Sequence, residues 1–176
     1  RNMRIRKAKN DRIDAEIVAK VLMFGEYQET SVSSDETLSL RQLCRYRLWQ
    51  VQTVSDLKRK IIALLDQVFP EYENLFTDIF GMSSKELLKL YTTPEEIASI
   101  NTLKLTNLLV SHSKGRFGKD KALEIKAIAK GSLGIRIATD AFAFQIRQML
   151  EQLEFVDKQI EGIDVEIKAY MDKLNS

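Results

Sequence analysis

Two aspartates near the start of the chain, Asp11 and Asp14, have the residue type and the spacing that metal chemistry needs. They are three positions apart in a segment with helical periodicity from about residue 11 to residue 24, so both carboxylates should project from one helix face. Such a pair can bind Mg²⁺, which prefers oxygen ligands and completes its shell with water or phosphate. Acidic residues in the first turn of a helix also offset the helix dipole. Taken alone, the two residues leave both roles open.

Basic side chains surround these aspartates. Residues 1–20 contain seven basic and three acidic groups, although the net charge of the whole chain is only +2. A basic segment of this kind can neutralise phosphates, and it can equally be a solvated end of the chain. The candidates for contact with nucleic acid are Arg4, Arg6, Lys7, Lys9 and Arg12. Residues 151–176 show the opposite imbalance, with seven acidic and three basic groups.

The composition excludes several classes of protein. Seven Gly and two Pro in 176 residues are too few for a many-stranded sandwich or barrel, which needs frequent turns. A single cysteine, Cys44, excludes internal disulfides and favours a reducing compartment. A single histidine, His112, excludes a histidine-based metal site or catalytic triad. Because no apolar run approaches the roughly 18 residues of a membrane span, we expect a cytoplasmic protein that does not enter a membrane.

Two long helices dominate the expected fold. Apolar residues recur at steps of three and four from Ser34 or Asp35 to Pro70, and this stripe includes Cys44, which we therefore place in the core. The same repeat continues without a break from Phe142 to Leu174, as in the seam of a coiled coil. The sequence predicts an antiparallel coiled-coil arm within one chain. Pairing of each helix with its copy in a second chain is the alternative.

Residues 71–137 are expected to form a small helical bundle inserted between the arm segments, which are residues 32–70 and 138–176. The sequence Thr93-Pro94-Glu95-Glu96 is a strong helix start, with proline and acidic residues in the first turn. The loop from Gly115 to Gly118 has two interpretations, an ordinary interhelical loop or a turn that presents backbone amides to a DNA phosphate. The predicted fold class is therefore all-α.

The stretch Lys9-Asn10-Asp11-Arg12-Ile13-Asp14-Ala15-Glu16-Ile17-Val18-Ala19 resembles the Lys-x-Asp-x-x-Asp-Ala motif of the DEDD transposases of bacterial insertion sequences. This is the IS-one-ten class, whose relatives include the pilin-gene invertases. The resemblance implies that residues 1–31 are the end of a RuvC-like, RNase-H-type α/β catalytic domain, and that the short helix is left over from it. It implies further that Asp11 and Asp14 bind Mg²⁺ and that Lys9 and Arg12 lie beside DNA.

The same resemblance implies an enzyme that cuts and joins DNA, guided by an RNA, with a coiled coil that joins subunits into a homo-oligomer. In this family another Asp and a Glu lie upstream of the motif and a serine domain lies downstream, so we expect these 176 residues to be inactive alone. The competing hypothesis is a helical coiled-coil dimerisation or adaptor module without enzymatic activity. It explains residues 35–176 equally well but treats the Lys9-to-Ala19 motif as a coincidence.

Overall fold

The computed structural model of the chain describes Ala19, Met23 and residues 34–174. The described residues contain six α-helices and one 3-10 helix and no strand, which confirms the prediction of an all-α fold. The chain divides into two compact units, Arg1–Asp35 and Glu36–Ser176. The short helix expected from residue 11 to residue 24 lies mostly outside the described residues. No described helix is long and apolar enough to cross a membrane.

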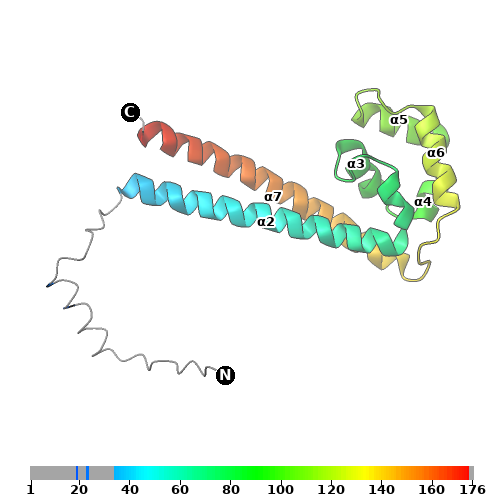
Figure 1. Cartoon of the computed structure of the whole chain (residues 1–176). Coiled ribbons are helices and arrows are strands. Elements are labelled where there is room, and N and C mark those ends of the chain that lie inside the picture. Colours follow the sequence, from blue (N-terminus) through cyan, green and yellow to red (C-terminus); the bar gives the residue numbers. More distant parts are fainter. Residues whose placement is uncertain (1–18, 20–22, 24–33, 175–176) are drawn as a thin grey trace, which may run out of the picture. The chain divides into compact units, whose positions relative to one another are not determined.

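Helices α2 (Asp35–Val68) and α7 (Thr139–Leu174) form an antiparallel arm within one chain (Figure 1). At 1.5 Å per residue, helices of 34 and 36 residues are each about 50 Å long. As the residue numbers rise along α2, the numbers of the contacting residues on α7 fall. Arg47 contacts Asp164, Gln50 contacts Gln159, and Leu57 packs with Leu153. This order of contacts confirms the predicted antiparallel pairing.

The buried stripe of α7 follows the predicted seam, and Ile146, Leu153 and Val156 are among its buried residues. On α2 the prediction was partly wrong, because Cys44 is exposed. In the same half of α2 as Cys44, the residues that face α7 include Gln50, which is only 6% exposed. Gln50 is polar, so a pattern based on apolar residues gave it no weight, whereas Arg47 is a charged member of the predicted seam. The Arg47 guanidinium donates to Asp164 and the Gln50 amide donates to Gln159. Both partners belong to α7 and lie more than 100 residues away in the sequence.

Five short helical segments separate the two arm helices. They are η1 (Pro70–Asn74), α3 (Met82–Leu90), α4 (Pro94–Ser99), α5 (Thr102–His112) and α6 (Lys119–Lys130). Helix α4 begins where the sequence predicts a helix start. The structure adds a capping box, in which the Thr93 side chain accepts the Glu96 backbone amide and the Glu96 side chain accepts the Thr93 backbone amide. Gly81 is the N-cap of α3.

One continuous hydrophobic core joins these segments to the neighbouring end of the arm. It contains Ile61 and Leu65 of α2, Ile146 and Leu150 of α7, and Tyr72 between them in the sequence. Tyr72 is fully buried and donates its hydroxyl proton to the Ser84 carbonyl oxygen at 3.1 Å. Burial raises the pKa of this phenol, and the hydrogen bond with the Ser84 hydroxyl lowers it only in part. The tyrosine therefore remains a neutral core residue.

The chain returns from the bundle to α7 through a close contact with the end of α2. A Cβ atom on Gly134 would lie 1.9 Å from the Val68 carbonyl oxygen, so only glycine fits here. The next amide, that of Ile135, donates to the Gln67 carbonyl oxygen at 2.8 Å. The Glu71 carboxylate accepts from the Leu133 amide at 2.9 Å and from the Ser132 hydroxyl at 2.7 Å. These contacts hold both ends of the bundle at the end of α2. We call the contacting residues, 67–71 and 132–135, the neck.

Candidate functional site

The residues that the sequence singles out for metal and nucleic-acid binding lie outside the described residues. These are Asp11 and Asp14 for metal, and Arg4, Arg6, Lys7, Lys9 and Arg12 for nucleic acid. Among the residues that are described, no group of three or more His, Cys, Asp or Glu side chains is placed to hold a metal ion.

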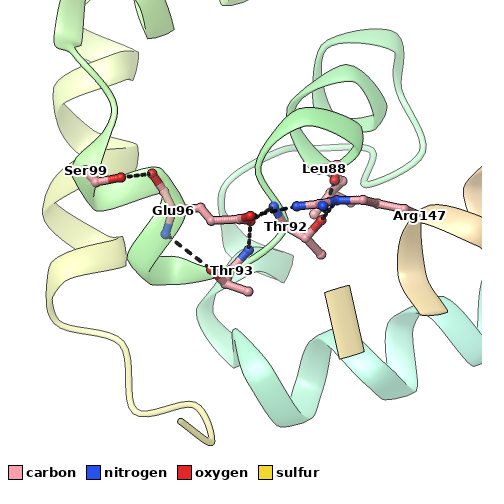
Figure 2. Close-up of polar contacts among 6 residues, drawn as sticks. All are labelled: Leu88, Thr92, Thr93, Glu96, Ser99 and Arg147. Carbon is pink, nitrogen blue, oxygen red and sulfur yellow. Dashed lines mark hydrogen bonds and ion pairs between the residues drawn. The ribbon is translucent and has the colours of Figure 1, made fainter. Parts of the chain in front are cut away.

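Glu96 is the centre of a polar cluster between the bundle and the arm (Figure 2). Its carboxylate accepts hydrogen bonds from the Thr92 amide at 2.7 Å, the Thr93 amide at 3.0 Å and the Arg147 guanidinium at 2.7 Å. Arg147 also donates through Nε to the Thr92 hydroxyl at 3.0 Å. Since Arg147 belongs to α7, this cluster fixes the start of α4 against the arm.

The electrostatics of Glu96 agree with a positioning role. Burial alone would raise its pKa, but the Thr93 amide, the Arg147 guanidinium and the Thr92 amide together hold the pKa below its ordinary value. Both carboxylate oxygens already accept strong hydrogen bonds, so the group stays ionised and has little capacity to act as a general acid. The sequence predicted the helix start that contains Glu96 but not its partner Arg147, because the two residues are 51 positions apart.

A cavity of about 240 Å³ opens beside the start of α3. Its walls come from three segments: residues 76–78, the first residues of α3, and Arg116 with Phe117 from the loop before α6. Asp78 lines it too, but one carboxylate oxygen already accepts the Phe80 amide at 2.9 Å. The Ser84 hydroxyl is within hydrogen-bond distance of Tyr72. The cavity thus brings together no nucleophile with a free base, and it does not resemble a catalytic site.

The half of the arm distant from the bundle exposes apolar side chains. Leu48 is 70% exposed and Trp49 is 64% exposed, and the Trp49 ring lies 5.8 Å from that of Tyr46. Neither aromatic ring is therefore buried in the core. The two helices also differ in charge: Arg41 and Arg45 are exposed on α2, and Glu161 and Glu166 are exposed on α7.

Comparison with known proteins gives a match to a family model. Residues 1–70 match the family model of the IS110-class DEDD transposases, which is described as transposase. The matched segment includes the Lys9-to-Ala19 motif and the whole of α2. Neither the search of curated proteins nor the search of solved structures found a match. The match covers the first 70 of the 176 residues, and its family is the one that the aspartate motif resembles.

Proposed function

We propose that this chain takes part in cutting and joining DNA at a Mg²⁺-dependent site to which Asp11 and Asp14 contribute ligands. The observation that carries the proposal is the match of residues 1–70 to a transposase family, because this segment contains both aspartates. Carboxylate oxygens suit Mg²⁺, which in turn neutralises charge on a reacting phosphate. The neighbouring basic residues would contact the DNA backbone: Arg4, Arg6, Lys7, Lys9 and Arg12.

The arm has a separate role in this proposal. Residues 1–31 belong to the catalytic domain, residues 32–70 and 138–176 form the arm, and residues 71–137 form the inserted bundle. The arm joins two subunits through the half that carries Leu48 and Trp49. This assignment is supported by their exposure, because the outer face of an isolated helix pair is ordinarily polar. The basic surface of α2 and the acidic surface of α7 would be complementary between two copies.

The resemblance to the family also supports a guide RNA as a second nucleic-acid partner. Nothing in the aspartate motif distinguishes RNA from DNA, since phosphate contacts are common to both. The adaptor hypothesis, by contrast, gains no support from the family match, which extends over the motif that the hypothesis leaves unexplained.

The metal site is tested in the active transposase that contains these residues. Asp11→Asn and Asp14→Asn should each lower the rate of Mg²⁺-dependent DNA cleavage by more than about a hundredfold, because each removes a direct metal ligand. Glu16→Gln is the matched control, since it removes a carboxylate two positions from Asp14 that the motif does not use. Circular dichroism checks that the helical fold is kept. Full cleavage by either Asp variant would show that these acids only stabilise a helix.

A further inference from the structure

Charge is divided unevenly between the two halves of the inserted bundle. Residues 71–100 contain six acidic and two basic side chains. Residues 101–138, which include α5 and α6, contain two acidic side chains and eight basic ones. The eight are Lys104, Lys114, Arg116, Lys119, Lys121, Lys126, Lys130 and Arg136. The near-neutral net charge of the whole chain therefore does not reveal the excess of basic side chains in residues 101–138.

About half of these basic side chains have structural partners. Lys121 pairs with Glu124 at 2.9 Å, Lys126 donates to the Ile100 carbonyl oxygen, and Lys104 lies over the Tyr91 ring. Arg136 lies 3.8 Å from Glu95. In contrast, Lys114, Lys119 and Lys130 are exposed and make no ion pair with any described residue. Lys114 and Lys119 flank the loop between α5 and α6, so unpaired positive charge is concentrated there.

Lys114 occupies a backbone position that favours glycine. Its φ is +55°, in the left-handed region, and the Gly115 amide donates to the Val110 carbonyl oxygen at 3.1 Å. This is the Schellman arrangement at the end of α5, in which the left-handed residue is usually glycine. A lysine there carries a conformational cost of about 1–2 kcal/mol. Attraction to the carboxyl end of α5 offsets only part of it, about 0.3–1 kcal/mol.

The loop lacks aromatic side chains on which bases could stack. Phe117 is the sole aromatic residue of the sequence from 101 to 138 apart from His112. Its ring packs edge-on against Phe76 with the centroids 5.8 Å apart, so it belongs to the core side of the loop. Single-stranded nucleic acid is ordinarily held by stacking on exposed aromatic rings, whereas a duplex can be held by phosphate contacts alone. The surface therefore fits a duplex better than a single strand.

We propose that the loop between α5 and α6, with Lys114, Arg116 and Lys119, contacts the phosphate backbone of duplex DNA. This inference rests on the proposed function, in which the protein handles DNA, and adds a second contact surface to it. In the compact unit Glu36–Ser176, α5 and α6 lie away from the free ends of α2 and α7 (Figure 1). The contact would thus be separate from the subunit interface proposed for the far half of the arm.

The test measures binding of the whole 176-residue chain to a labelled DNA duplex by fluorescence anisotropy at several salt concentrations. Replacing both Lys114 and Lys119 with glutamine should raise the dissociation constant about tenfold at low salt. It should also reduce the dependence of log K on log salt by about two units, because two phosphate contacts are lost. The matched control, Lys158→Gln with Lys168→Gln, removes the same charge from exposed positions of α7 and should leave this dependence unchanged.

A second variant separates binding from folding. Lys114→Gly relieves the left-handed strain, so its thermal midpoint should not fall while its affinity for the duplex does. Equal effects of the loop and control pairs would overturn the proposal, as would failure of the unsubstituted chain to bind. A larger loss for single-stranded DNA than for the duplex would refute the assignment to a duplex. None of these outcomes decides the Asp11 and Asp14 cleavage test, so the two proposals can fail separately.

Discussion

Replacing Gly134 with alanine tests how the neck is held together. The added Cβ atom would lie 1.9 Å from the Val68 carbonyl oxygen and 2.4 Å from its carbonyl carbon. These are backbone atoms at the end of α2, so neither can rotate away as a flexible side chain would. The return segment must move outward, and the hydrogen bond from the Ile135 amide to Gln67 must lengthen or break.

The expected cost follows from these two effects. Forcing an extra carbon into a packed position costs about 1–3 kcal/mol, and loss of one backbone hydrogen bond adds about 0.5–1.5 kcal/mol. We expect Gly134→Ala to lower the free energy of unfolding by about 2–4 kcal/mol. For a chain of this length, that is a fall of about 4–15 °C in thermal midpoint.

Gly162→Ala is the matched control. It is the same substitution, but we expect it to raise the thermal midpoint rather than lower it. Gly162 lies inside α7, and apart from its chain neighbours and the backbone of its own helix no atom lies within 4 Å of the position that its Cβ would take. Alanine is favoured over glycine in a helix by about 1 kcal/mol, so the midpoint should rise by about 2–4 °C. Thermal unfolding followed by circular dichroism measures both variants. A Gly134→Ala protein as stable as the unsubstituted chain would refute the close approach at the neck.

Two further predictions concern the arm and the cluster around Glu96. Glu96→Gln should lower the free energy of unfolding by about 1–2 kcal/mol, after allowance for its partial exposure. Glu95→Gln, whose partner lies 3.8 Å away on the surface, should change it by less than about 0.5 kcal/mol. The lowered pKa of Glu96 means that its contribution is complete above the ordinary value of 4.5 and disappears as the pH falls through the lower folded value. Chemical denaturation between pH 7 and pH 3 should therefore show a smaller loss for Glu96→Gln than for the unsubstituted chain, and parallel curves would contradict this linkage. Trp49→Ser should reduce the mass measured by analytical ultracentrifugation towards that of a monomer. Phe144→Ser, at an equally exposed position of 64% near the other end of the arm, should not, and an unchanged mass for both variants would argue against the proposed subunit interface.

The long helices could be predicted because their signals are local and repeated. The seam of α7 runs through apolar residues at each step, and the buried face follows it from Ile146 to Ile163. The start of α4 was equally clear, since proline and acidic residues in the first turn of a helix are a local signal. Such features depend on the neighbouring sequence alone, so no knowledge of the fold is needed to find them.

The errors arose where distant partners decide the outcome. Cys44 fits an apolar stripe, but α2 instead turns Gln50 inward, and the Gln50 amide donates to Gln159 at 3.1 Å. A buried amide is tolerated only when a partner satisfies it, and the sequence does not reveal a partner 109 positions away. Arg147 and Gly134 were missed for the same reason. The aspartate motif is different, because its assignment comes from the family match and the two residues lie outside the described part of the chain.

The neck has a consequence for how this protein can vary. Because Ile135 is hydrogen-bonded to Gln67, the bundle leaves the arm and rejoins it at neighbouring points. When the two ends of an inserted segment lie close together, a change in its length or sequence costs the rest of the protein little chain entropy. The arm can therefore accept a different inserted domain between α2 and α7. Exchange of residues 72–131, which leaves the neck residues Glu71 and Gly134 in place, for a different insert that covers Ile61 and Ile146 should preserve the arm and give it a new surface.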